Sequence, residues 1–368
     1  ALKADGSVWS FGLNSYGQLA LKDNKNYNEP QKIELDTRAK QIAVGTAHTV
    51  ILTEEGKVLT SGLNTSGQLG NGTVSNANTL VNVLNEYGKE IENIAMVSSY
   101  NNTTYLLDYD GNVYACGKGY KKVAVKLEGL KNIAQISGKY GISAENKVID
   151  LSTKQAIEGL KDIIKISQGE NHAIFLSKDK IAYAIGTNTN GQCGNGTKVN
   201  CMTPTIIKDN VGTGILSNIK DISAGNNFSM AVLENGEVYT WGSNENNKLG
   251  TEQTTDQVLP KKNSNTSNGI IVSAGTNHAV YVKEEGNVYA WGNGKKGSLG
   301  NRVNANSVEP VLVGAQEVVV NTNHVTIEKG NKTTLNANLK TFNLINNLSE
   351  KEMTYISNDK QTVKVDAT

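Results

Sequence analysis

The chain has few of the features that mark several large classes of protein. Its 368 residues include only 3 Cys and 4 Pro, and aromatic residues make up 6%. Three cysteines cannot build a dense disulfide framework, and a chain of this length can bury a core without one. No apolar run approaches the ~20 residues that cross a bilayer as a helix. We therefore expect no membrane insertion of this chain.

An excess of charge of one sign is also lacking. The 36 Lys and Arg residues are balanced by 35 Asp and Glu residues, which gives a formal net charge of +1. Proteins that wrap nucleic acid depend on clusters of uncompensated basic side chains, because these release counterions from the phosphates. No such cluster stands out, so we expect no nucleic-acid partner.

Glycine is abundant, at 37 positions, and it marks an internal repeat. Two-residue turn signals, flanked by strand-forming residues, occur seven times and are typical of β-hairpins. They lie at Asp5-Gly6, Glu55-Gly56, Asp110-Gly111, Glu145-Asn146, Asp179-Lys180, Asn235-Gly236 and Glu285-Gly286, and the third and fourth intervals are the shortest. The average spacing falls in the range of β-propeller blades.

Other residues keep a fixed distance from these turns. Six residues after the turn stands a glycine: Gly12, Gly62, Gly117, Gly186, Gly242 and Gly292, with Ser152 as the exception. Eleven residues after it begins a Gly-Gln-Leu-Gly-like tetrad, as in Gly67–Gly70, which two repeats lack. Eleven residues before it begins a Gly-x-x-His pattern at Gly45, Gly169 and Gly275, with Phe228 replacing histidine after Gly225. Short strands of this kind must stack as successive sheets to bury their apolar faces.

The repeat resembles a known family in two stretches above all. Glu234–Asn244 reads ENGEVYTWGSN, and Gly62–Gly72 reads GLNTSGQLGNG. Both are similar to the regulator-of-chromosome-condensation repeat, and the similarity covers residues 1–316. It implies an all-β, seven-bladed propeller. The third and fourth blades, at residues 106–175, should be short because their tetrad loop is deleted.

The two ends of the chain suggest how the ring closes. The first hairpin lacks its incoming strand, and Glu317–Val320 with Asn321 resembles that strand, so we predict that residues 317–321 pair with residues 1–12. Residues 325–335, 354–359 and 363–366 also resemble a bacterial immunoglobulin-like domain of surface proteins. Such a sandwich needs ~100 residues. We expect a propeller over 1–321, an incomplete immunoglobulin-like β tail over 322–368, and a longer parent protein at both ends.

Three motifs that could bind a cofactor or a metal are better explained by structure. Gly292–Gly297 spells G-x-G-x-x-G, but no helix pattern follows to face a pyrophosphate. His48, His172 and His278 occupy equivalent repeat positions, which lie apart in a ring, so we expect them to bond the backbone of the neighbouring blade. The fourth histidine is His324. Asp108–Asn112 has part of a calcium-loop spacing but lacks the closing glutamate. We predict no cofactor, no metal and no catalytic residues.

The three cysteines differ in their settings. Cys193 and Cys201 lie in one long loop and could form a disulfide in an oxidising compartment, whereas Cys116 occupies a strand position and should pack in its sheet. Nothing in the sequence fixes the separation that a disulfide needs. The pairing of Cys193 with Cys201 stays open at this point.

The preferred functional hypothesis is a non-catalytic binding propeller of a secreted or cell-surface bacterial protein. Loops on one face would bind a protein or glycan, and the chain would be monomeric. The longest loops run over 195–216, 250–269 and 71–86. Tyrosines suited to an interface are scattered: Tyr16, Tyr27, Tyr87 and Tyr100.

Two alternatives remain at this stage. The family includes the exchange factor for the Ran GTPase and a protein inhibitor of β-lactamases, so the resemblance also implies a regulator that binds one enzyme or GTPase. A polysaccharide-acting enzyme is the other alternative. It would require carboxylates that converge to within ~5–10 Å in a cleft.

Overall fold

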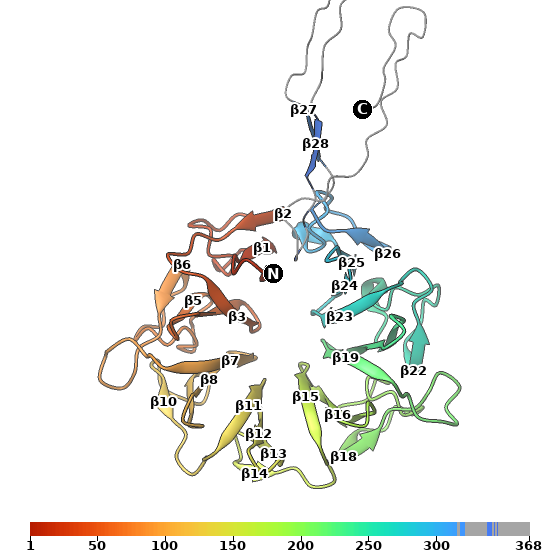
Figure 1. The fold of residues 1–368 in the computed structure, drawn as a ribbon, viewed down its shortest axis with the longest axis horizontal. Coiled ribbons are helices and arrows are strands. Elements are labelled where there is room, and N and C mark those ends of the chain that lie inside the picture. The colour runs from red at the N-terminus through yellow and green to blue at the C-terminus, as the bar shows by residue number, and fades with distance from the viewer. Residues whose placement is uncertain (315–316, 321–336, 341, 343, 345–368) are drawn as a thin grey trace, which may run out of the picture.

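The structure is a computed structural model that describes residues 1–314, 317–320, 337–340, 342 and 344. The regular elements of these residues are β-strands and two short 3₁₀ turns, without any α-helix. Six four-stranded antiparallel sheets stand around a central axis, and the chain visits them in order (Figure 1). In each sheet the first strand lies nearest the axis and the fourth lies at the rim. The chain is therefore an all-β propeller.

The strand bounds follow the repeat closely. The six sheets are, in order, β3 (Ala39–Val44), β4 (His48–Thr53), β5 (Val58–Gly62) and β6 (Ala77–Asn82); β7 (Ile94–Tyr100), β8 (Thr103–Asp108), β9 (Val113–Gly117) and β10 (Val125–Lys126); β11 (Ile133–Ser137), β12 (Tyr140–Ser143), β13 (Val148–Asp150) and β14 (Gln155–Ala156); β15 (Ile163–Gln168), β16 (His172–Ser177), β17 (Ala182–Gly186) and β18 (Cys201–Ile206); β19 (Ile219–Ala224), β20 (Phe228–Leu233), β21 (Val238–Gly242) and β22 (Gln257–Lys262); and β23 (Gly269–Ala274), β24 (His278–Lys283), β25 (Val288–Gly292) and β26 (Ser307–Leu312). The predicted shortening appears in the rim strands β10 and β14, which have two residues each.

The hairpin between the second and third strands shows why the sequence folds this way. In the first full sheet, Gly56 has a φ of +81°, which only glycine adopts without strain, and its N–H donates to Thr53 O over 3.1 Å. The register then places Leu52 opposite Val58 and Val50 opposite Thr60. All four side chains are buried, because both faces of this sheet are covered by neighbouring sheets.

A smaller sheet occupies the remaining sector of the ring. It consists of β1 (Trp9–Gly12) and β2 (Tyr27–Lys32), and Leu2 forms an isolated bridge with Val8 beside them. Figure 1 shows this sheet between β3–β6 and β23–β26. Among the described residues, the expected ring of seven blades is thus seen as six full sheets and one two-stranded sheet.

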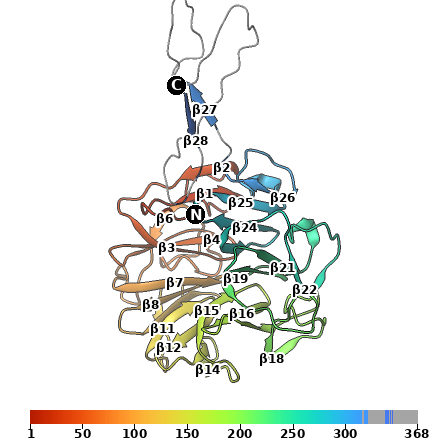
Figure 2. The same ribbon diagram turned by 45° about the vertical axis from the view of Figure 1, so that its right-hand side comes forward.

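The predicted pairing of residues 317–321 with residues 1–12 is not what the structure shows. Glu317–Val320 forms β27, which pairs antiparallel with β28 (Ala337–Lys340), and this two-stranded sheet lies outside the ring (Figure 2). A short valine-rich strand can pair with any free edge, so its composition did not identify its partner. Residue 321 and most of the expected tail at 322–368 lie outside the described residues.

Phe342 and Leu344 take over the contact with the first hairpin. The ring of Phe342 is 8% exposed and packs edge-on against Trp9, with 5.7 Å between ring centroids. Leu344 O accepts a hydrogen bond from Ala4 N, and Leu344 N donates to Gly286 O, at 2.9 and 3.0 Å. We call these two residues the clasp, because they join the first hairpin to the last full sheet.

Side chains from one sheet also satisfy the innermost strand of the next sheet. Asp221 accepts a hydrogen bond from Val272 N over 3.0 Å, and it forms an ion pair with Lys165. Gln41 bonds both backbone groups of Val97, over 3.0 and 3.1 Å. Further bonds of this kind run from Ala224 N to Ser167 Oγ and from Ala274 N to Ser223 Oγ, each over 2.9 Å. These bonds cap polar groups that the sheet's own ladder leaves unpaired.

Candidate functional site

A hollow lies at the rim, between two neighbouring sheets. It has a volume of 710 Å³, within the range of about 300–1,000 Å³ that is usual for ligand sites. The link between β6 and β7 forms one wall, and Tyr114, Ala124 and Lys126 of the next sheet form the other.

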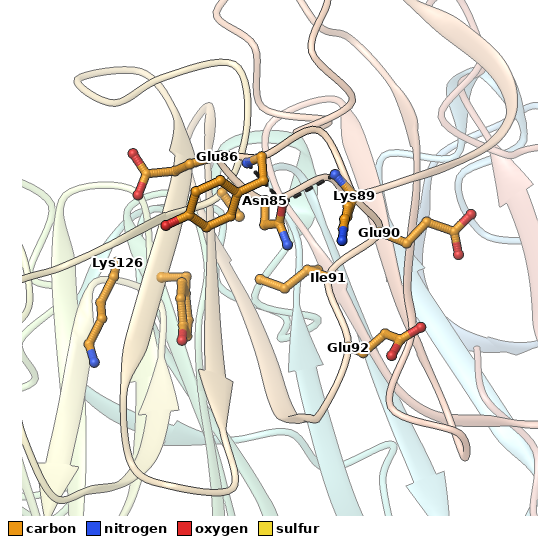
Figure 3. A pocket seen from close by; sticks show the side chains of 10 residues that line it. Asn85, Glu86, Lys89, Glu90, Ile91, Glu92 and Lys126 are labelled. Atoms are coloured by element: carbon orange, nitrogen blue, oxygen red, sulfur yellow. Dashed lines mark hydrogen bonds between the residues drawn. The ribbon is translucent and has the colours of Figure 1, made fainter.

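The link is a rigid hairpin, which we call the Tyr87 hairpin (residues 84–90). Its ends pair through a bridge between Leu84 and Glu90. Asn85 ties its turn together, because its side-chain oxygen accepts hydrogen bonds from Tyr87 N at 3.0 Å and Lys89 N at 3.1 Å (Figure 3). A second bond runs from Ala124 N to Leu84 O over 2.8 Å and fixes the hairpin to the next sheet. Tyr87 is 88% exposed at its tip.

The charged groups of the hollow do not form a catalytic arrangement. Glu86 pairs with Lys121 over 3.0 Å, and Glu90 accepts a hydrogen bond from Asn82 over 2.6 Å. In Figure 3 the carboxylate of Glu86 points to the opposite side from those of Glu90 and Glu92. A pair of carboxylates facing one substrate bond, as glycoside hydrolysis needs, is therefore not formed by these three residues. The hollow is suited to polar contacts with a bound partner.

The histidines that recur in the repeats act within the ring. Thr104 Oγ1 donates to Gln68 O over 2.8 Å, so His48 Nε2 must donate to Thr104 Oγ1, over 3.0 Å. His172 makes the same contact with Ser229 over 2.8 Å. Each of these two histidines thus bonds a hydroxyl group of the adjacent sheet. That hydroxyl group, and not the histidine, donates to a backbone carbonyl. This corrects the expected direct bond to the backbone.

The environment of these histidines keeps them neutral. Burial lowers the pKa of both His48 and His172 to about 4, and it also lowers the pKa of His278. The imidazole of His48 lies so close to Gly45 that a Cβ there would be 2.1 Å from Cε1, which explains the Gly-x-x-His pattern. No group of three or more metal-ligating side chains occurs among the described residues, and His324 lies outside them.

The other two motifs form turns. Lys295–Gly297 is a single 3₁₀ turn, so no helix N-terminus follows the Gly292–Gly297 triplet. Asp108 uses its carboxylate within its own hairpin, where it accepts hydrogen bonds from Asn112 N and Nδ2, both over 2.8 Å. Both segments are therefore explained as turns of the repeat.

A match to a known protein family agrees with this fold. The RCC1-like domain matches residues 1–335 of the chain. The chain belongs to the RCC1-like domain family. The match extends past the predicted propeller boundary at residue 321.

Individual relatives of this RCC1-like propeller agree. It is 28% identical over 265 residues to the ultraviolet-B receptor UVR8 of Arabidopsis thaliana, covering 71% of this chain and 54% of the receptor. It is 25% identical to the X-linked retinitis pigmentosa GTPase regulator homolog of Caenorhabditis elegans, covering 72% of this chain and 20% of that protein. The chain therefore spans about half or less of the length of these relatives. The solved structure of Prp20p from Saccharomyces cerevisiae has the same fold, with a TM-score of 0.73, 22% identity, and coverage of 87% of this chain and 90% of Prp20p.

The tyrosines selected from the sequence have different roles in the RCC1-like ring. Tyr87 and Tyr16 are exposed, at 88% and 42%. Tyr27 donates to Asp23 over 2.8 Å, and Tyr100 donates to Glu170 O over 2.9 Å, across the short sheet β11–β14. Only Tyr87 also borders the hollow.

The three long loops were predicted too long. Each contains the rim strand of its sheet, namely β6 in 71–86, β18 in 195–216 and β22 in 250–269. The sequence did not point to the other wall of the hollow, because its residues belong to the next repeat. They are Tyr114, Ala124 and Lys126. The available sequence signal was the missing tetrad loop of that next repeat, because a tetrad loop at that place would lie over the Tyr87 hairpin. No helix among the described residues is long and apolar enough to cross a bilayer.

Proposed function

We propose that the chain is a non-catalytic binding propeller that recognises a protein partner through the Tyr87 hairpin and the hollow beside it. The exposure of Tyr87 carries this proposal, because an aromatic side chain that is 88% exposed contributes nothing to the core. Tyrosines dominate the binding energy of many protein interfaces. A rigid hairpin lowers the entropy lost when Tyr87 is immobilised by a partner.

The relatives support a protein partner. The work on Prp20p describes its binding to Gsp1p and histones, and another relative is named a GTPase regulator homolog. By analogy, the partner of this chain is a protein rather than a glycan. Regulation of an enzyme or GTPase by the same surface is the second candidate, favoured by the name of that regulator homolog.

The finer architecture and the location are also proposals. Leu344 N bonds Gly286 O as Ile94 N, at the start of β7, bonds Gly56 O. Leu344 thus takes the place at which an innermost strand begins, which supports a seventh blade completed by the C-terminal segment. We propose a monomeric ring and an immunoglobulin-like tail beyond residue 344, in place of the expected 322–368. The sequence resemblance of residues 354–359 and 363–366 to that domain supports the tail, and with it we propose a secreted or surface location. Surface proteolysis of intact source cells, followed by peptide mapping, tests the location.

Photo-crosslinking tests the binding surface. A benzophenone side chain at position 87 should capture one defined protein from an extract of the source and its surroundings. The same group at position 16, an exposed tyrosine in the loop between β1 and β2, is the matched control. With the captured protein purified, Tyr87→Ala should weaken binding by tenfold or more, and Tyr16→Ala by less than threefold. Equal losses, or capture only from position 16, would refute the site.

Stimulation of nucleotide exchange, or inhibition of the captured enzyme, would identify the regulatory role. Binding without any change in activity would leave the scaffold role. Turnover of a substrate by the purified propeller would refute the non-catalytic assignment.

A further inference from the structure

Two of the three cysteines replace residues at facing positions of a single repeat. The third residue of the tetrad is leucine in four repeats and cysteine in one: Leu19, Leu69, Leu249 and Leu299 against Cys193. The residue that pairs with the glycine ending the third strand varies in the same repeats: Tyr27, Ala77, Gln257 and Ser307 against Cys201, which pairs with Gly186. Both changes to cysteine fall in the repeat of the sheet β15–β18: Cys201 begins β18, and Cys193 lies in the loop before it.

The fold brings these two side chains into contact. Both are buried, at 0% and 5% exposure, in one apolar cluster. The sulfur of Cys193 lies 4.0 Å from the carbonyl oxygen of Gly186, the residue opposite Cys201. Both side chains pack within this cluster, and both thiols are free in this structure.

We propose that Cys193 and Cys201 are a redox-active pair that closes to a reversible disulfide across the loop 194–200. Cys116 serves as the internal contrast. It lies in β9 of another sheet, and its sulfur contacts Gln68 O at 3.6 Å. It therefore has no cysteine partner in reach among the described residues.

The reaction is an exchange with a low-molecular-weight disulfide, RSSR. The thiolate of Cys201 attacks one sulfur of RSSR, forms the mixed disulfide Cys201–S–S–R and releases RS⁻. The thiol of Cys193 then loses its proton, attacks the sulfur of Cys201 and releases the second RS⁻. In total, two protein thiols and RSSR give one protein disulfide and two RSH.

The local chemistry assigns the order of these steps. The neighbouring Cys193 thiol lowers the pKa of Cys201, which favours Cys201 as the attacking thiolate. The interaction with Cys201 and burial raise the pKa of Cys193, which makes it the resolving thiol. Exposed neighbours flank Cys201: Val199 is 74% and Met202 is 85% exposed. A small opening of the loop would therefore admit RSSR.

Thiol counting on the unmutated chain tests the proposal without relying on a variant. The reduced chain is incubated with oxidised glutathione, quenched with acid, and alkylated in denaturant. We expect one alkylated cysteine, Cys116, and a peptide pair linked through Cys193 and Cys201 in the mass spectrum. Dithiothreitol should restore three alkylated cysteines.

Variants identify the roles of the individual cysteines. Cys116→Ser should leave the disulfide intact, while Cys193→Ser should trap the glutathione adduct on Cys201. Oxidised chain should also resist cleavage within 194–200 by a broad-specificity protease more than reduced chain does. Three alkylated cysteines after oxidation, any disulfide that includes Cys116, or a stable glutathione adduct on the unmutated chain would each overturn the proposal.

Discussion

The clasp makes a quantitative prediction about ring closure. Phe342 is 8% exposed, packs against Trp9, and belongs to the cluster that contains Val288 and Val313 of the last full sheet. Replacing a buried phenylalanine by alanine costs about 3–5 kcal/mol, and the lower end applies here because only one seam of the ring is affected. A loss of about 3 kcal/mol corresponds to a rise of about 100-fold in the equilibrium constant for opening that seam.

Hydrogen exchange measures this opening directly. The amides of Ala4 and Leu344 are bonded across the seam, so Phe342→Ala should speed their exchange by that factor, while amides in β15–β18 stay unchanged. Tyr87→Ala is the matched control, because it removes an aromatic ring that is 88% exposed and should change stability by less than about 0.5 kcal/mol. Equal exchange at the seam in both variants would show that the clasp does not hold the ring closed.

Two further predictions concern the interior of the ring. His48 and His172 have pKa values of about 4 when folded and 6.5 when unfolded, so the unfolded chain binds more protons between these values. The free energy of unfolding is therefore unaffected by these histidines above pH 6.5. It falls by up to about 3 kcal/mol for each histidine as the pH drops towards 4, and the urea midpoint should fall over the same pH range. Asp221→Ala should cost about 2–4 kcal/mol, because it leaves Lys165 and the buried amide of Val272 unpaired. Glu34 forms an exposed ion pair with Lys22, so Glu34→Ala should cost less than about 1 kcal/mol in the same urea assay. Similar costs for the two variants would contradict a stabilising role of the bonds between sheets.

The repeat made most of the fold predictable. A hairpin turn, a glycine six residues later and a Gly-x-x-His eleven residues earlier fix the second and third strands, because local geometry determines them. The two-residue rim strands β10 and β14 were also foreseen, from the missing tetrads. Glu317–Val320 was placed wrongly, because pairing between distant segments depends on tertiary contacts that composition does not encode.

The candidate site was less predictable for a related reason. Tyr87 was one of four tyrosines noted in the sequence, and nothing in the chain order distinguished it from Tyr27 or Tyr100. Its importance follows from its exposure and from the neighbouring sheet, which are both three-dimensional properties. The facing positions of Cys193 and Cys201 become visible only when the strand register aligns the repeats.

The bonds between innermost strands all point in one direction around the ring. Gln41, Ser167, Asp221 and Ser223 each bond the sheet that follows in the sequence. A chain synthesised from its N-terminus therefore has the capping side chains for each sheet in place before that sheet emerges. The two-stranded sheet β1–β2 is the exception. Its neighbour β23–β26 and the clasp at Phe342 and Leu344 are the last parts of the ring to be synthesised. The ring can thus be assembled sheet by sheet but can be closed only once the end of the propeller has been made.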